Sequence, residues 1–459
     1  MSLPIAPERV LPTLNADGTR NRIRPRPYDG RLLRARRLVA WALMALFVSL
    51  PLLRIHGKPA MLLDVMHRQF VLFGHTYLPT DGVLLMLLML GIFVSIVLIT
   101  ALVGRAWCGW ACPQTVYMEF LFRPLERLFE GPREAQLRID KNGVNGRRVA
   151  KNAVYLLLAI VLANVFLSYF VGTDTLRHWV LEAPSQHLGG FSVVLVTTGL
   201  VFFDFAYFRE QMCTVICPYA RIQSVLLDPK SLVIGYDARR GEPRSHGKPK
   251  AAGHGDCIDC QACVTTCPTG IDIRQGLQLE CIACGQCADA CDSIMDRIKK
   301  PRGLIRYSSQ SALESGKPVG MLRPRVFIYA VLLLGLALSL VLVAGGRPTA
   351  EITVLRGLGA PFTEAGPDVI NQLRLKVGNR SEKTRQFSVT LVDFPAARLV
   401  APELPLTVKA GEQAATSFFV VVPRAELHGS RRVQLRVGDG KTFELVPYTL
   451  LGPEGEMAR

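Results

Sequence analysis

Eight cysteines in the middle of the chain have the types and spacing to do chemistry. They form two runs, CIDCQACVTTCP and CIACGQCADAC, and each run has the spacing C-x2-C-x2-C-x3-C. Their positions are Cys257, Cys260, Cys263, Cys267, Cys281, Cys284, Cys287 and Cys291. Disulfide frameworks are typical of short secreted chains, whereas this chain has 459 residues and gathers all 12 cysteines between Cys108 and Cys291. The spacing therefore indicates metal binding.

The same spacing is the ligand run of bacterial two-cluster ferredoxins, in which the fourth cysteine of each run binds the other cluster. It predicts two 4Fe-4S clusters, one held by Cys257, Cys260, Cys263 and Cys291 and the other by Cys281, Cys284, Cys287 and Cys267. Zinc is the alternative, but a zinc site needs only four ligands, usually in two C-x-x-C pairs. Asp292 departs from the pattern, because proline follows only the first run. Two clusters in series imply one-electron transfer.

A second pattern, C-x-x-x-C-P, occurs twice and follows an apolar run each time. RAWCGWACPQ contains Cys108 and Cys112, and EQMCTVICPY contains Cys213 and Cys217. Helix positions i and i+4 share one face, so each pair is expected to point one way. The proline suits the first turn of a following helix or a sharp kink. Each pair lies at the end of an apolar run, and the two runs are expected to cross the membrane in the same direction. We therefore expect the four thiols to converge.

Four converging thiols permit several kinds of chemistry. Soft thiolates suit Cu(I), zinc or an iron–sulfur cluster, and a redox-active dithiol is a further reading. Buried cysteines with a structural role are the simplest alternative. The spacing of the four cysteines does not choose among these.

Five apolar runs are the candidate membrane spans that must position these cysteines. They are Leu38 to Leu53, Gly82 to Val103, Ala153 to Gly172, Leu188 to Phe208 and Val326 to Ala344. A span needs about 20 apolar residues, and the first run is short of that. The basic loops predict that the N-terminus, the 105–152 loop and the 209–325 region lie in the cytoplasm. An odd number of spans then places the C-terminus outside, which is the periplasm of a bacterium.

The overall composition fits a membrane protein. Hydrophobic residues make up 49% of the chain and the mean hydropathy is +0.26. The formal net charge of +17 would also suit a nucleic-acid binder. The basic residues nevertheless flank apolar spans, as in membrane topogenesis, so no nucleic-acid partner is expected.

The domain organisation follows from these runs. We expect a basic cytoplasmic tail at 1–37, without a cleavable signal, and a four-helix membrane region at 38–208. A cytoplasmic region at 209–325 contains the ferredoxin domain at about 253–300. A fifth membrane helix at 326–344 precedes 345–459, where alternating segments such as INQLRLKV and ATSFFVVV predict an immunoglobulin-like β-sandwich. The fold class is thus a polytopic α-helical membrane protein with an inserted two-cluster ferredoxin domain.

Weaker candidates remain outside the cysteine patterns. Asp204 lies inside the fourth span, where a carboxylate is a functional suspect, although Arg209 is near enough for an ion pair. Trp107 and Trp110 flank Cys108 and suit interface anchoring or an electron relay. The outer loop offers copper or haem ligands without a supporting spacing, namely His56, Met61, Met66, His67 and His75.

Four long segments resemble those of a known family. GRAWCGWACPQTVYMEF, FFDFAYFREQMCTVICPYARIQS, YDARRGEPR and the double cysteine run are similar to the CcoG family, also called FixG or RdxA. The trailing PRGLIRYSS and the C-terminal sandwich fit the same family. The resemblance covers nearly the whole chain beyond the N-terminal tail.

The resemblance implies an accessory protein of cytochrome c oxidase in the bacterial inner membrane. It implies support of cbb3-type oxidase assembly by reduction of Cu(II) to Cu(I), with the oxidase subunits or copper-delivery proteins as partners. Cys108, Cys112, Cys213 and Cys217 would then be the catalytic and copper-binding residues. The electron donor does not follow. Two alternatives stay open, which are a quinol-oxidising subunit similar to NapH and an assembly scaffold without enzymatic activity.

Overall fold

The computed structural model divides the chain into two compact units, Met1–Val341 and Leu342–Arg459. The described residues are 9–15, 17, 20–55, 57–66, 69–77, 82–143, 145–245, 254–316, 323–346, 348–381 and 383–453. Of the expected outer-loop ligands, His56 and His67 lie outside these residues, as do the first eight residues of the expected tail.

Four helices are long and apolar enough to cross a membrane. They are α2 (Gly82–Val103), α7 (Gly146–Val171), the run Leu188–Phe208 that begins with α9 (Leu188–Phe203), and α15 (Pro324–Gly345). α7 packs against α9 and is the most buried of the four. The other three helices bury few of their residues and expose many large apolar side chains, which is a surface that requires lipid.

Helix α1 (Arg31–Ser49) covers most of the expected first span but is not among the four. It begins seven residues before Leu38, so its first two turns carry arginines. Asp289 explains this start, because its carboxylate accepts hydrogen bonds from the backbone N–H groups of Leu32 (3.2 Å) and Leu33 (2.8 Å). The carboxylate thereby satisfies the free donors of the first turn. The five expected spans therefore correspond to the four long apolar helices and to α1.

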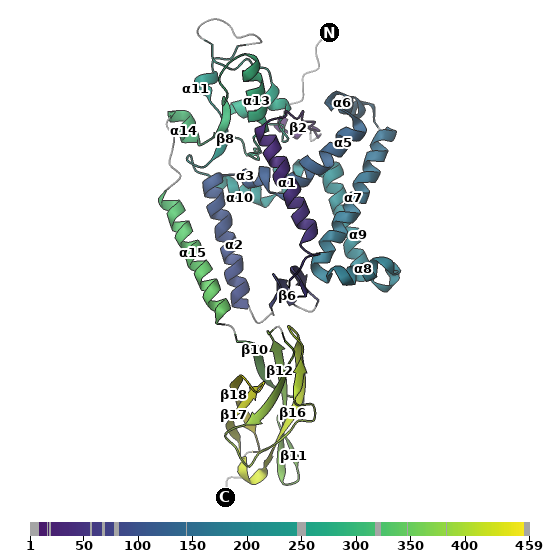
Figure 1. Ribbon diagram of the computed structural model, residues 1–459, viewed down its shortest axis with the longest axis vertical. Coiled ribbons are helices and arrows are strands. Elements are labelled where there is room, and N and C mark those ends of the chain that lie inside the picture. Colours follow the sequence, from purple (N-terminus) through teal and green to yellow (C-terminus); the bar gives the residue numbers. More distant parts are fainter. Residues whose placement is uncertain are drawn as a thin grey trace. The chain divides into compact units, whose positions relative to one another are not determined.

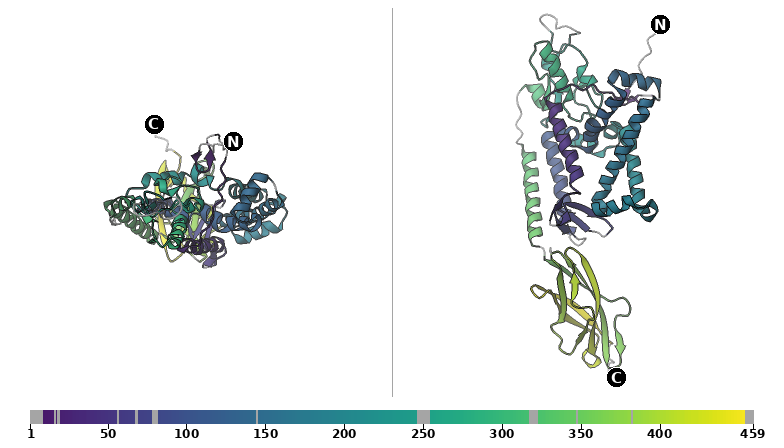
Figure 2. Two further views of the ribbon diagram at one scale, coloured as in Figure 1. Left: turned by 90° about the horizontal axis from the view of Figure 1, so that it is seen from above. Right: turned by 45° about the vertical axis from the view of Figure 1, so that its right-hand side comes forward.

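The axes of the spans in the first unit lie roughly parallel to one another (Figure 1 and Figure 2). At one end of them lie the cysteine-rich elements around α13, and at the other end a small sheet near β6. That sheet and its neighbours comprise β3 (Arg54–Ile55), β4 (Lys58–Pro59), β5 (Met61–Asp64), β6 (Gln69–Leu72), β7 (His75–Tyr77), α8 (Thr173–Leu181) and η2 (Pro184–Gln186).

Short helices with irregular turns follow the spans at the cysteine-rich end. After α2 these are α3 (Ala106–Trp110), α4 (Pro113–Tyr117), η1 (Met118–Phe122), α5 (Arg123–Glu130) and α6 (Arg133–Asn142). After α9 they are η3 (Asp204–Phe208), η4 (Met212–Ile216) and α10 (Pro218–Leu226). The segments η1, η3 and η4 are π-helical, a geometry that is rare and is frequently found at functional sites.

The ferredoxin-like region is held together by a two-stranded antiparallel ladder in which Val233 pairs with Ser308. Its elements are β8 (Val233–Tyr236), α11 (Ala238–Gly241), α12 (Ala262–Thr265), η5 (Ile273–Gln275), α13 (Gln286–Arg297), β9 (Ile305–Ser308) and α14 (Gln310–Ser315). The N-terminal strands β1 (Arg9–Leu11) and β2 (Leu14–Asn15) pair with each other. The core of the ferredoxin-like region consists mainly of isoleucines and of the cysteines themselves, with Met295 and Leu304 beside them.

The second unit is a sandwich of two antiparallel sheets, as the alternating segments predict. One sheet has the order β10-β12-β16-β14 with β11 added to β12, and the other has the order β15-β13-β17-β18. The strands are β10 (Ala350–Arg356), β11 (Thr363–Ala365), β12 (Asp368–Asn379), β13 (Arg385–Leu391), β14 (Arg398–Val400), β15 (Leu406–Val408), β16 (Gln413–Pro423), β17 (Ser430–Gly438) and β18 (Phe443–Leu451). Alternate residues of β12 and β16 are fully buried and form the core between the sheets.

Candidate redox site

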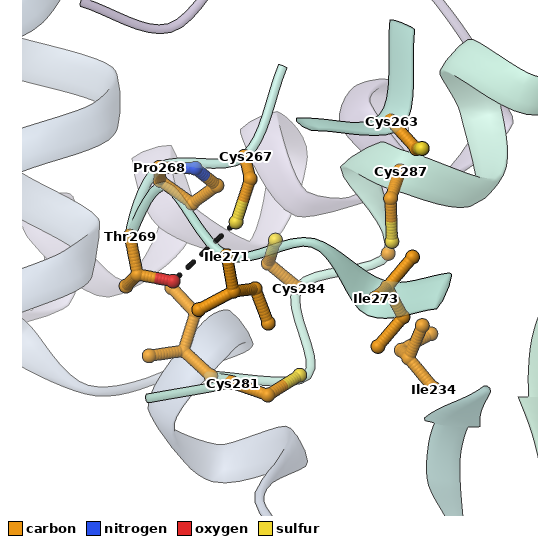
Figure 3. Close-up of a pocket in the computed structure, with 12 residues that line it drawn as sticks. Ile234, Cys263, Cys267, Pro268, Thr269, Ile271, Ile273, Cys281, Cys284 and Cys287 are labelled. Atoms are coloured by element: carbon orange, nitrogen blue, oxygen red, sulfur yellow. Dashed lines mark hydrogen bonds between the residues drawn. The ribbon is translucent and has the colours of Figure 1, made fainter. Parts of the chain in front are cut away.

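One small pocket gathers the cysteines predicted to hold the second cluster (Figure 3). Cys267, Cys281, Cys284 and Cys287 line it, and so does Cys263. Figure 3 shows their sulfur atoms turned toward a common space. The remaining walls come mainly from isoleucines, which exclude water from that space.

A second small pocket gathers the four cysteines predicted to hold the first cluster. Cys257, Cys260, Cys263 and Cys291 line it, together with apolar side chains of β9 and α13. Cys260 is exposed, whereas the other three are buried. Each pocket therefore contains one predicted group of four cysteines, which includes the fourth cysteine of the other run, and Cys263 lines both pockets.

Both runs wind around their cavities in the same way. Asp259 (φ 52°) and Gln261 (φ 58°) in the first run match Ala283 (φ 50°) and Gly285 (φ 78°) in the second. These left-handed residues flank the second cysteine of each run, Cys260 or Cys284. Such a backbone turns successive N–H groups toward one side, a shape that suits anionic clusters. The third cysteine of each run then falls in the first turn of α12 or α13.

The chemistry of the cysteines fits an iron–sulfur cube better than a single ion. Among the described residues, no three His, Cys, Asp or Glu side chains are grouped closely enough to hold one metal ion. In a cube, each cysteine binds a different iron, so the sulfurs stand further apart. Burial raises the pKa of Cys281 to about 12 and of Cys284 to about 11, so these thiols must lose protons when iron binds.

Asp292, the departure from the ferredoxin pattern, has a structural role. Its carboxylate accepts a hydrogen bond from the backbone N–H of Gly303 at 2.8 Å. That bond holds the chain after α13 as it turns back into β9. The substitution of aspartate for proline therefore leaves the eight cysteines in place.

The C-x-x-x-C-P segments do not form one continuous helical turn, contrary to the expectation from i and i+4 spacing. Cys112 precedes α4 with extended backbone (φ −62°, ψ 126°), and Cys217 precedes α10 with φ −61° and ψ 110°. The cause is the following proline, which disfavours helical backbone in the residue before it and then occupies the first helical position. The two segments break in the same way at the same place.

The four thiols of these segments nevertheless approach one another. Burial raises the pKa of Cys213, and Cys112, Cys108 and Cys217 raise it further. Burial also raises the pKa of Cys108 to about 12, with a contribution from Cys112. The Cys108 thiol donates a hydrogen bond to Oε1 of Gln223 at 3.2 Å. Without a bound metal, the Cys108 thiol is therefore protonated at neutral pH.

The first C-x-x-x-C-P segment lies directly against the loop of the second cluster. A Cβ added to Gly109 would lie 2.6 Å from the carbonyl oxygen of Ile282 and 2.8 Å from Cα of Cys284. Trp110 donates from Nε1 to the hydroxyl of Tyr307 at 2.9 Å, and that hydroxyl donates to the carbonyl of Ala283 at 2.6 Å. Only glycine at position 109 allows this backbone contact.

Two buried arginines, Arg36 and Arg105, connect the C-x-x-x-C-P segments to the loop around Cys281–Cys284, here called the cluster loop. Arg36 is fully buried, donates from Nε to the carbonyl of Gly109 at 2.7 Å, and lowers the pKa of Cys284 against the larger effect of burial. Arg105 donates to the backbone carbonyls of Leu279 and Ala220. The sequence analysis missed both, because the basic residues of the 1–37 tail and of the 105–152 loop were interpreted only as signals of membrane topology.

A buried ion network fixes the second C-x-x-x-C-P segment to the helices. Burial disfavours the charge of Glu126, but Arg209 and Arg24 hold the pKa of this carboxyl well below its usual range. Arg209 donates to both oxygens of Glu126, at 2.8 and 3.0 Å. The positive φ of Arg209 (56°) lets the chain turn sharply between η3 and η4. The network thereby sets the position of Cys213.

The weaker candidates from the sequence differ in the contacts that their side chains make. Trp110 makes the hydrogen bond to Tyr307, whereas Trp107 is partly exposed. Met66 is 88% exposed and no ligand group forms around the outer-loop residues that the structure describes. Asp204 accepts a hydrogen bond from Nε2 of Gln114 at 3.1 Å and does not pair with Arg209, whose partners are Glu126 and Glu210.

Comparison with known proteins gives matches over most of the chain. Protein RdxA of Cereibacter sphaeroides is 34% identical over 390 residues, which cover 81% of this chain and 82% of that protein. Nitrogen fixation protein FixG of Rhizobium meliloti is 32% identical over 427 residues, which cover 83% and 81%. The chain belongs to the FixG/RdxA family. Ferredoxin-type protein NapH of Haemophilus influenzae is 23% identical and covers 58% of this chain and 88% of its own.

Three family models match separate parts of this FixG/RdxA protein. A 4Fe-4S dicluster domain matches residues 208–310, and the IG-like fold at the C-terminal of FixG matches 340–453. A 4Fe-4S binding domain matches 85–132, a segment whose only cysteines are Cys108 and Cys112. With the apolar helices, these matches make the chain a membrane-associated iron–sulfur electron-transfer protein.

Proposed function

We propose that this protein passes electrons from two 4Fe-4S clusters to the cysteines of its C-x-x-x-C-P segments and there reduces Cu(II) to Cu(I). These four residues, here called the membrane-side cysteines, are Cys108, Cys112, Cys213 and Cys217. The observation that carries the proposal is the contact of Gly109 with the Ile282–Cys284 loop. It joins the Cys108–Cys112 segment to the cluster loop without intervening side chains. Electron transfer falls steeply with distance, so a direct backbone contact favours it.

The proposed cluster ligands are the two groups of four that line the two cavities. Cys257, Cys260, Cys263 and Cys291 would hold one cluster, and Cys267, Cys281, Cys284 and Cys287 the other. Such clusters supply one electron at a time, which matches the single electron that Cu(II) accepts. Soft thiolates then retain Cu(I) in preference to Cu(II).

The proposed setting is the inner membrane of a bacterium. The N-terminus and the ferredoxin domain would lie in the cytoplasm and the sandwich of 345–459 in the periplasm, if α1 is counted as a fifth crossing. Support comes from the basic residues that surround the cysteine-rich end, as the positive-inside rule expects. The product would serve assembly of a cbb3-type oxidase, with oxidase subunits or copper-delivery proteins as partners.

Purified protein tests this function. Chemically reduced wild type is mixed without oxygen with Cu(II) and a chelator that reports Cu(I). We expect one Cu(I) for each electron stored, and a loss of about tenfold or more in rate when Cys108, Cys112, Cys213 and Cys217 are changed to Ser with the clusters intact. Equal rates in both proteins would contradict a role of the four cysteines, and no Cu(I) from wild type would contradict copper reduction.

The scaffold alternative predicts a different result in cells. If the protein acts only by holding oxidase subunits, Cys284→Ser and Cys263→Ser should leave oxidase assembly normal while removing the clusters. We expect assembly to fail in these variants and to recover partly when copper is supplied in reduced form. Normal assembly without clusters would favour the scaffold.

A further inference from the structure

A pocket of about 520 Å³ lies among the apolar helices, apart from the two pockets that the cluster cysteines line. Its walls come from α1, α4, α7, α9 and the π-helical turns η3 and η4. Most wall residues are apolar, such as Phe47, Leu162, Phe166 and Val201. Leu200 and Phe203 line it and are also largely exposed on the outer surface of α9, so the cavity lies beside the lipid.

Four polar side chains line this mostly apolar pocket, namely Gln114, Tyr117, Thr197 and Asp204, and three of them bear on its ligand. Gln114 donates from Nε2 to Asp204 at 3.1 Å and to the carbonyl of Arg209 at 3.2 Å. The hydroxyl of Tyr117 is buried and has no hydrogen-bond partner within the part of the chain that the structure describes. A buried hydroxyl without a partner is costly, and a carboxylate within a membrane span is costly too. Both indicate a ligand that carries hydrogen-bonding oxygens.

The cavity also adjoins the membrane-side cysteines. Pro113 follows Cys112 in the chain, Met212 precedes Cys213, and Ile216 precedes Cys217, and all three neighbours line the cavity. A ligand seated there would lie next to the proposed electron-transfer centre. The polar group at this end and the apolar walls at the other call for a molecule with a polar redox head and an apolar tail.

We propose that this cavity binds a membrane quinol, with the Tyr117 hydroxyl and Gln114 at its ring oxygens and Asp204 as the acceptor of its first proton. Conversion of a quinol to a quinone releases two electrons and two protons. The two electrons match two one-electron iron–sulfur centres per chain, and the second proton passes to water. The proposal rests on the electron-transfer function and supplies the donor class that the copper proposal lacks.

Photolabelling of the purified full-length protein tests the site. A photoreactive azidoquinone is the probe and decylubiquinone is the competitor, and labelled peptides are mapped by mass spectrometry. We expect saturable labelling of α9 and η3 in wild type. Val201→Trp fills the cavity and should weaken labelling by about tenfold or more, whereas Leu195→Trp, exposed on the same helix and outside the cavity lining, should not.

Asp204→Asn supplies a second measurement in case the bulky variant does not fold. It keeps the hydrogen bond with Gln114 but cannot accept the proton, so labelling should persist while decylubiquinol reduces the clusters at least about tenfold more slowly, followed by EPR. Azidoquinone labelling of the Val201→Trp variant at the wild-type level would overturn the proposal. So would an unlabelled wild type from which mass spectrometry recovers a tightly bound phospholipid instead.

The copper proposal is separable from this one. Chemically reduced Val201→Trp protein needs no quinol, so it should reduce Cu(II) at the wild-type rate. Loss of copper reduction in that assay would count against the proposed function, and loss of quinone labelling alone would concern only the donor site.

Discussion

Gly109 of the membrane-side motif and Cys284 of the second cysteine run are in backbone contact, so close that a Cβ on Gly109 would lie 2.8 Å from Cα of Cys284. These residues are 175 positions apart in the chain, yet no side chain separates them. The contact links the loop Ile282–Cys284 directly to the first C-x-x-x-C-P segment, and a single added methyl group would disturb it.

Gly109→Ala should push the cluster loop away from α3. The added methyl group meets backbone atoms of Ile282 and Cys284, which cannot rotate aside, so we expect a loss of about 1–3 kcal/mol in stability. Iron analysis and thermal unfolding in detergent would measure it, with slower reduction of Cu(II). Gly91→Ala is the matched control, since nothing lies within 4 Å of a Cβ there. An unchanged melting temperature and iron content in the Gly109 variant would contradict the contact.

Arg36→Met should make the potential of the second cluster more negative. Reduction adds negative charge to a cluster, and the buried guanidinium of Arg36 beside Cys284 favours that charge. We expect a shift on the order of 60 mV, a tenfold change in a one-electron equilibrium, by EPR-monitored redox titration. Arg36→Lys should shift it less, and the exposed Arg34→Met on the same helix should leave it unchanged. An equal shift in both methionine variants would rule out a local effect.

Iron content decides whether the four membrane-side cysteines hold a third cluster. Two cubes contain about eight irons per chain, and we expect this number both in wild type and in the variant with Ser at positions 108, 112, 213 and 217. Iron and sulfide analysis with EPR would measure it. A wild type with about twelve irons that falls to about eight in the variant would instead assign a cluster to these cysteines.

Alkylation of Cys108 should depend steeply on pH. Because burial raises the pKa of this thiol to about 12, it is protonated at neutral pH, and its reactive thiolate increases about tenfold for each pH unit below that value. Iodoacetamide labelling of protein with intact clusters, read by mass spectrometry, should rise across the alkaline range without levelling near pH 9. Cys108→Ser identifies the peptide. A plateau below pH 9 would mean that the thiol is not protected by burial.

Glu126→Gln should destabilise the membrane unit strongly. The variant leaves Arg24, Arg209 and Lys151 without their shared carboxylate, and breaking a buried ion pair typically costs about 3–5 kcal/mol. Thermal unfolding in detergent would measure this loss. Glu134→Gln, at an exposed position of α6, is the control and should have almost no effect. A Glu126 variant as stable as this control would contradict the role of the network.

Local patterns in the sequence were sufficient for much of the architecture. Apolar length predicted α2, α7, α9 and α15, and alternation predicted the strands β10, β12, β13, β16 and β17 of the sandwich. Short strands such as β14 and β15, and the final strand β18, were not predicted, since their segments lack a clear alternation. The length of α1 was also misjudged, because its first turn is capped by Asp289, which lies more than 250 residues away.

Spacing alone predicted which cysteines act together, since in a two-cluster ferredoxin pattern the fourth cysteine of each run binds the other cluster. Only the tertiary structure decided how the two cysteine systems meet, because Gly109, Arg36 and Tyr307 reach the cluster loop from distant segments. The polar end of the apolar cavity is likewise a tertiary feature, formed where Gln114 meets Asp204. Such contacts depend on packing between elements, and no local pattern of residue types encodes that packing.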